Sequence, residues 1–374
     1  MGSDASPCDF GCIRRSIIEA RLCLAAGLFL VSCTVNPDER RQMVVVQSSE
    51  QTSVIPPSSQ GSAQDHLERG IALGSRGNLD GAIEELQIAA RLAPENVDAL
   101  VNLGLAYEKK DEWALATASY ECALQLQPKH AGAHMGLGVI RHRTGELSKA
   151  IAEYRTALRL DPASVNAHYN LGLALHASGD RQGAIAEYDT VIRANPEYPL
   201  AHYNLGVALW EEGDVDGTVM EMGIALGLQP DLVDAHFYLA RALEAKRDWD
   251  AATAEYQSVM RLRPNDVRAY LRLGSVYEQT GHMSDSVGVY EDARRIAPDN
   301  VEVRVALGLA LKATGQYAAV REELEAALRL LPERPGQEER RKQLQQAIQE
   351  AATKSYREEG RAKEDRNEKE DRNE

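Results

Sequence analysis

The fold of this chain is decided by one stretch, residues 165–196, which reads VNAHYNLGLALHASGDRQGAIAEYDTVIRANP. Leu171 and Gly172 lie in its first half, and Gly179 separates that half from the second. A glycine readily adopts the positive φ that ends a helix, and a proline such as Pro196 cannot donate a hydrogen bond to the preceding turn. The stretch therefore predicts two antiparallel helices joined by a tight turn.

The same pattern recurs along most of the chain. Prolines stand 34 residues apart from Pro94 to Pro332, which defines eight repeats with the proline at position 32. Position 8 is glycine in every repeat except the sixth, which has Ala240, and position 24 is tyrosine in five repeats. A glycine at position 8 lets the second helix approach the first closely, and the aromatic side chain fills the interface. One helix pair cannot bury its own apolar face, so the pairs must stack into a solenoid.

The pattern resembles the tetratricopeptide repeat (TPR) family, and AHYNLG at 167–172 and 201–206 resembles the first-helix consensus of that family. The resemblance implies an all-α, right-handed superhelical solenoid of eight 34-residue helix-turn-helix repeats. The expected repeats are 63–96, 97–130, 131–164, 165–198, 199–232, 233–266, 267–300 and 301–334. Asp111 and Arg247 stand where the other repeats have the turn glycine, and the fifth repeat has the weakest second helix.

Two segments follow the repeats. Residues 335–358 carry apolar residues roughly on one face, which predicts a helix that caps the last repeat. Residues 359–374 are charged or polar and are expected to form a solvated tail, helical or disordered.

The N-terminal 62 residues differ in composition from the repeats. Arg14, Arg15 and Arg21 precede a continuous apolar run over 22–31, which is shorter than the ~20 residues that a membrane-spanning helix needs. The run ends in LVSC at 30–33, which resembles the lipobox of bacterial lipoproteins. The resemblance implies a signal peptide over 1–32, lipidation of Cys33, and a lipidated N-terminus with a flexible tether over 33–62.

Other interpretations of this N-terminal segment stay open. Cys33 could follow an ordinary signal peptide or an uncleaved anchor by chance, or the true start could be Met43 in a cytoplasmic protein. If the protein is a lipoprotein, it is expected in the bacterial cell envelope. Thr34, where an aspartate would favour retention at the inner membrane, then slightly favours the outer membrane.

Composition and motifs argue against several function classes. A formal charge of −15 does not suit binding to nucleic acid, which needs a basic surface. The five cysteines form no paired zinc pattern, and no GxSxG, P-loop or HExxH motif occurs. Histidine recurs at position 4 because the repeat recurs, so it is expected to serve packing; these residues are His66, His134, His168, His202 and His236. We expect no enzyme activity, no metal and no cofactor.

The family resemblance implies a concave groove, lined by the first helices, that binds a protein or peptide. Aromatic residues recur at lining positions and favour a partner site, since exposed aromatic clusters tend to dominate binding energy. The candidate groove residues are Asn102, Met135, Tyr169, Asn170, His176, Tyr203, Asn204, Trp210 and Phe237. The apolar residues at position 9 could equally line the groove or pack between helices. The lysine and asparagine with which chaperone-binding relatives clamp a terminal carboxylate are absent.

These observations predict a membrane-tethered scaffold for protein–protein interactions. By family analogy it would serve assembly in the envelope: pilus or secretin biogenesis, outer-membrane protein insertion, polysaccharide export, or recruitment of cell-wall enzymes. The alternative is a soluble cytoplasmic TPR adaptor or co-chaperone whose first 60 residues are wrongly assigned.

Overall fold

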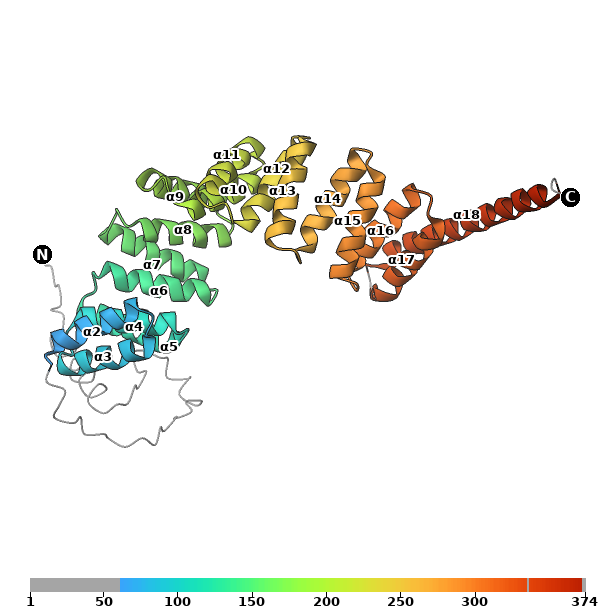
Figure 1. Cartoon of the computed structure of the whole chain (residues 1–374). Coiled ribbons are helices and arrows are strands. Elements are labelled where there is room, and N and C mark those ends of the chain that lie inside the picture. The colour runs from blue at the N-terminus through green and yellow to red at the C-terminus, as the bar shows by residue number, and fades with distance from the viewer. Residues whose placement is uncertain (1–60, 335, 372–374) are drawn as a thin grey trace, which may run out of the picture. The chain divides into compact units, whose positions relative to one another are not determined.

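A computed structural model describes residues 61–334 and 336–371, with side chains to 357, and all regular structure in this part of the chain is helical (Figure 1). The first helices of the repeats are α2 (Ala63–Ser75), α4 (Val97–Lys109), α6 (Ala131–Arg143), α8 (Val165–Ala177), α10 (Pro199–Glu212), α12 (Val233–Ala245), α14 (Val267–Gln279) and α16 (Val301–Ala313). The second helices are α3 (Leu79–Leu92), α5 (Trp113–Leu126), α7 (Leu147–Leu160), α9 (Arg181–Ala194), α11 (Val215–Leu228), α13 (Trp249–Leu262), α15 (Met283–Ile296) and α17 (Tyr317–Leu330). A final helix, α18, spans Glu338–Asp371. The predicted all-α architecture of consecutive helix pairs is confirmed.

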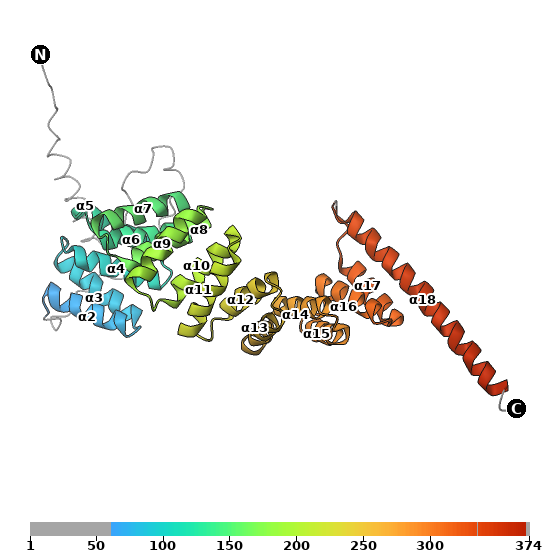
Figure 2. The same cartoon turned by 90° about the horizontal axis from the view of Figure 1, so that it is seen from above.

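The chain forms two compact units that divide within α9, the first ending at Thr190 and the second beginning at Val191. In the first unit each helix from α2 to α8 packs against the next in chain order, and the same holds from α10 to α18 in the second (Figures 1 and 2). First helices of neighbouring repeats also touch, for example α4 with α6 and α10 with α12. Each unit is therefore a stack of helical hairpins in which first helices lie beside first helices.

The turn between the two helices of a repeat has the same backbone conformation throughout. Position 15 has positive φ in all eight repeats, between 80° and 89° in the six that carry glycine. Asp111 and Arg247 occupy that position without glycine and still have φ of 60° and 61°. A non-glycine residue in this region costs about 1–2 kcal/mol, so packing of the flanking helices must impose the turn.

The close approach predicted at position 8 is confirmed. A Cβ on Gly104, Gly138 or Gly172 would lie 2.5–2.7 Å from the tyrosine ring at position 24 of the same repeat, closer than real Cβ atoms come. The Tyr154 and Tyr188 rings are fully buried. In these three repeats the two helices therefore meet where glycine exposes the backbone to an aromatic ring.

The fifth repeat keeps the close approach without an aromatic ring, since a Cβ on Gly206 would lie 2.9 Å from the Met222 side chain. Met222 replaces the tyrosine, and a Cβ on Gly223 or Gly227 would meet nothing within 4 Å. The second helix nevertheless forms over its full length as α11.

The position-4 histidines have a structural role, as predicted, but through a contact that the sequence analysis did not identify. In each of five repeats the histidine Nδ1 lies 2.5–2.6 Å from a carboxylate at position 23; the pairs are His66–Glu85, His134–Glu153, His168–Glu187, His202–Glu221 and His236–Glu255. In four of these repeats the Nε2 lies 2.9–3.2 Å from a proline carbonyl six residues earlier. In these four repeats the histidine therefore joins both helices of its repeat to the end of the preceding one.

The last repeat is covered by α18. Leu344 and Ala351 of this helix are buried in a cluster with Leu324 and Leu331. The Arg341 guanidinium donates hydrogen bonds to the carbonyl of Leu331 at 2.7 Å and to another carbonyl near the end of α17. The predicted cap is present, and the same helix continues to Asp371, into the segment expected as a charged tail.

Candidate functional site

The second unit carries a group of aromatic side chains on two neighbouring first helices. Tyr203 and Trp210 lie seven residues, or about two turns, apart on α10, so they share one face of that helix. Tyr238 and Arg241 lie three residues apart on the adjacent α12 and also share a face. All four are partly exposed, and we call them the aromatic–arginine cluster.

The geometry of the cluster is defined by ring contacts. The Tyr203 and Tyr238 rings meet edge to face, with centroids 6.3 Å apart and planes at 70°. The guanidinium carbon of Arg241 lies 4.6 Å from the Trp210 ring centroid and 5.9 Å from that of Tyr238. Edge-to-face pairs contribute about 0.5–1.5 kcal/mol and cation–π contacts at exposed sites about 0.5–1 kcal/mol, so these contacts hold the side chains in place.

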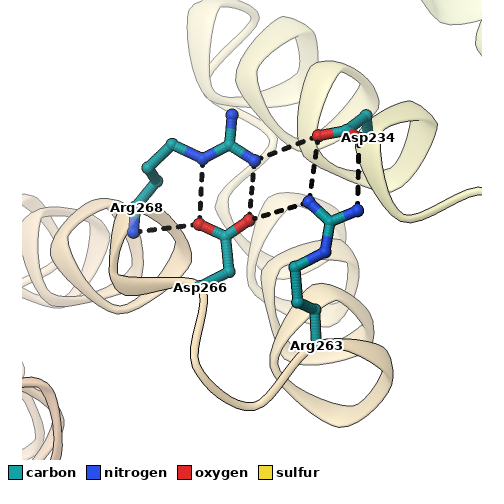
Figure 3. A network of polar contacts seen from close by, with 4 residues as sticks. All are labelled: Asp234, Arg263, Asp266 and Arg268. Carbon is teal, nitrogen blue, oxygen red and sulfur yellow. Dashed lines mark hydrogen bonds and ion pairs between the residues drawn. The ribbon is translucent and has the colours of Figure 1, made fainter. Parts of the chain in front are cut away.

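Beside this cluster lies a network of two arginines and two aspartates (Figure 3). Arg268 donates from Nε and a terminal nitrogen to the two Asp266 oxygens, at 2.9 and 2.6 Å, and to Asp234 at 3.0 Å. Arg263 donates to Asp234 at 3.3 and 3.4 Å and reaches Asp266 at 3.5 Å. Charge-assisted and bidentate contacts of this kind restrict side-chain orientation.

Asp266 is the central member of this network. It is only 8% exposed and stands at the N-cap of α14, where it accepts a hydrogen bond from the backbone N–H of Arg268. Hydrogen bonds from the Arg268 side chain hold the Asp266 pKa below its usual value of 3.8. The network thus links the start of α12 to the start of α14 through Asp234 and Arg268.

Phe237 was predicted to be an exposed aromatic residue of the groove, but its side chain is buried. It is 7% exposed, its ring centroid is 5.9 Å from that of Tyr256, and the Arg268 guanidinium lies 4.6 Å over its ring. The prediction of an exposed groove aromatic is therefore wrong for Phe237, because Arg268 of the next repeat covers the ring. The Phe237 ring also contacts the Tyr238 ring edge to face, with centroids 6.3 Å apart, and so supports the cluster.

The predicted groove residues of the first unit are all partly exposed: Asn102, Met135, Tyr169, Asn170 and His176. The Tyr169 ring lies 6.2 Å from that of Tyr188. The Nδ2 of Asn102 donates to a carbonyl one turn earlier in its own helix at 2.8 Å, as does Asn204 of the second unit. These two amides thus each use one hydrogen within their own helix.

The apolar residues at position 9 differ in their exposure. Leu105 is 41% exposed and lies at the surface, whereas Val207 is 8% exposed and packs within a buried cluster with Met222.

Four residues that shape the site are not among the predicted groove residues: Tyr238, Arg241, Arg268 and Asp266. Tyr238 could have been found, because it stands at position 6, where three other repeats carry asparagine. Within residues 61–334 and 336–357, no three His, Cys, Asp or Glu side chains are arranged to hold a metal ion.

Comparison with known families identifies the repeats. Models described as "TPR repeat" match residues 70–111, 140–179 and 174–213, and models described as "Tetratricopeptide repeat" match 97–130, 222–267 and 237–301. These segments are tetratricopeptide repeats. TPR folds bind proteins or peptides in a groove and generally serve as non-catalytic interaction scaffolds. The aromatic–arginine cluster lies on the first helices of two adjacent repeats.

Solved TPR structures share this fold. The C-terminal part of a TPR repeat-containing protein from Cytophaga hutchinsonii superposes with a TM-score of 0.53 at 18% identity, covering 64% of this chain and 99% of that one. The pilF protein of Pseudomonas aeruginosa superposes with a TM-score of 0.51 at 20% identity, covering 54% and 92%. At these identities the likeness concerns the fold alone. Among curated proteins, none matches the chain significantly.

Proposed function

We propose that this TPR protein is a lipid-anchored scaffold that holds a partner protein at the aromatic–arginine cluster. The observation that carries the proposal is the set of partly exposed Tyr203, Trp210 and Tyr238 rings around the stacked Arg241. Tyrosine, tryptophan and arginine are the residues that most often dominate binding energy at protein interfaces. Because their neighbours already fix these side chains, little conformational entropy is lost when a partner binds.

The partner-binding part of the proposal is tested by paired substitution. Trp210→Ala together with Tyr203→Ala should reduce capture of the partner from cells that make the protein, while circular dichroism keeps the helical signal. Gln257→Ala, on an exposed position of α13, is the matched control and should capture as wild type does. Equal capture by all three proteins would remove the cluster from the interface.

The anchor part of the proposal concerns residues outside those that the structure describes. It is supported by the sequence, where the apolar run ends in LVSC at 30–33. Each acyl methylene contributes ~0.8 kcal/mol, so two or three chains on Cys33 would hold the protein at a membrane durably. The polar segment that follows, residues 34–62, would span roughly 30 Å and let the repeats stand off that surface.

None of the described helices has the length and apolar character needed to cross a bilayer.

Metabolic labelling with palmitate tests the anchor. The wild type and Cys23→Ala should incorporate label, because Cys23 lies in the proposed signal peptide, and Cys33→Ala should not. Absence of label from the wild type would reject the lipoprotein. An anchored scaffold of this kind would serve assembly of an envelope complex, the role expected from family analogy.

A further inference from the structure

We infer that Arg241 selects the bound segment by pairing with a carboxylate, so that the partner presents an aspartate or glutamate beside an apolar or aromatic residue. The inference rests on the proposed function and names the chemistry that the aromatic–arginine cluster recognises.

The first observation is that the donors of Arg241 are unused among the residues that the structure describes. Its guanidinium stacks on Trp210 and Tyr238, but no hydrogen bond or ion pair joins it to any described residue. Arg268, the other arginine stacked on an aromatic ring nearby, has its Nε and one terminal nitrogen engaged by Asp266 and Asp234. Both arginines are oriented by ring contacts, and only Arg241 keeps its planar set of donors for a ligand.

The second observation comes from comparing the repeats with one another. Position 9 carries an aliphatic residue or serine in the other seven repeats: Ile71, Leu105, Val139, Leu173, Val207, Ser275 and Leu309. Packing of the repeat therefore does not require an arginine here. Among the eight repeats, arginine at position 9 occurs only in the sixth, and that repeat also carries Tyr238 at position 6.

The third observation is the surroundings of the guanidinium. Glu244 lies one turn further along α12, but it accepts a hydrogen bond from the Tyr256 hydroxyl at 2.7 Å and lies 3.7 Å from Arg272. It is therefore engaged elsewhere. On α10, Leu200 is 40% exposed and stands three residues before Tyr203, on the same face. An apolar surface thus continues from the cationic group.

A carboxylate fits this arrangement better than a neutral acceptor. Guanidinium and carboxylate form two parallel hydrogen bonds in one plane, and a ring stacked on the face of the guanidinium leaves its edge available. Arginine remains protonated over the whole physiological range, so the contact does not depend on a proton. Fixing Arg241 in advance reduces the entropy lost on pairing.

The test is a double-mutant cycle on a selected peptide. A displayed library of random 16-residue peptides is selected on the full-length chain, and the best acidic peptide is compared with its Glu→Gln or Asp→Asn version. Binding of both peptides is measured for the wild type, Arg241→Gln and Arg261→Gln, an exposed arginine of α13 that removes the same charge outside the cluster.

Arg241→Gln should weaken the acidic peptide about tenfold or more and change the neutral peptide less than about twofold, since hydrogen bonds to charged groups are worth about 1.5–3 kcal/mol. Arg261→Gln should change neither. Selected peptides without acidic residues, equal losses for both peptides, or the same loss in Arg261→Gln would overturn the role of Arg241 and leave the binding cluster intact. Failure to select any peptide that needs Trp210 would instead reject the proposed function.

Discussion

Replacing Gly274 by alanine should destabilise the seventh repeat, although alanine is the better helix former. A Cβ at this position would lie 2.2 Å from Cε1 and 2.5 Å from Cζ of Tyr290, and that ring is only 3% exposed. Overpacking a filled core costs typically 1–3 kcal/mol, and so short a contact with a buried ring belongs near the upper value. The higher helix propensity of alanine offsets about 1 kcal/mol of this cost, so the unfolding free energy should fall by about 2 kcal/mol.

Gly223→Ala in α11 is the matched control, because it is also a glycine inside a helix. No atom lies within 4 Å of its added Cβ, so only the propensity gain of about 0.5–1 kcal/mol remains. Urea unfolding followed by circular dichroism gives the sign of the change in unfolding free energy. Hydrogen exchange assigns that change to a repeat, since solenoid stability is largely a sum over neighbouring units. Shifts of the same sign for both variants would refute the packing argument. The sixth repeat already accommodates Ala240, so Ala240→Gly should lose about 1 kcal/mol.

Three further outcomes follow from the same contacts. Arg247→Gly should raise the unfolding free energy by about 1 kcal/mol in urea, because φ is 61° there; Asp111→Gly should gain less, since aspartate tolerates positive φ better. The hydrogen bond with Glu255 raises the pKa of His236 above 6.5. The contribution of this contact to the unfolding free energy is therefore fully present below pH 6.5 and is lost as the pH rises through the pKa of the folded state. Hydrogen exchange of the sixth repeat, corrected for intrinsic rates, should show this loss in the wild type and not in His236→Phe. Asp266→Asn should lower the unfolding free energy by about 1–3 kcal/mol at neutral pH and have little effect at a pH below the depressed Asp266 pKa, where the wild type is also uncharged.

The helix pairs could be predicted because their signals are local and periodic. Glycine at position 15 and proline at position 32 each act on the backbone within a few residues, and glycine at position 8 recurs in register with the large side chain at position 24 that it faces. Asp111 and Arg247 show the limit of that reasoning, since the turn persists without glycine when the flanking helices are packed.

The contacts of the position-4 histidines could not be predicted without knowing the register between the two helices of a repeat. The signal was nevertheless present, because position 23 changes together with position 4. The second repeat has Leu100 with Ser119, and the seventh has Tyr270 with Val289. In the eighth repeat Arg304 replaces the histidine and still contacts Glu323, at 2.8 Å.

The side-chain exposure of the predicted groove residues could be inferred only in part from their repeat positions. Tyr203 and Trp210 lie on the expected face of α10, and both are partly exposed. The error at Phe237 arose because a repeat position says which face a residue occupies and not what covers it. The cover is Arg268 of the following repeat, whose orientation depends on hydrogen bonds to Asp266 and Asp234. Such a network between repeats leaves no periodic trace in the sequence.

The central claim is that a partner binds where α10 and α12 present the aromatic–arginine cluster. Its most direct test places a photo-reactive benzoylphenylalanine at residue 203 of the full-length chain in cells, and at residue 257 of α13 in a parallel strain. Irradiation should give one dominant crosslinked product from residue 203, lost on Trp210→Ala, and none from residue 257. Equal products from both positions, or a product from residue 257 alone, would contradict the account.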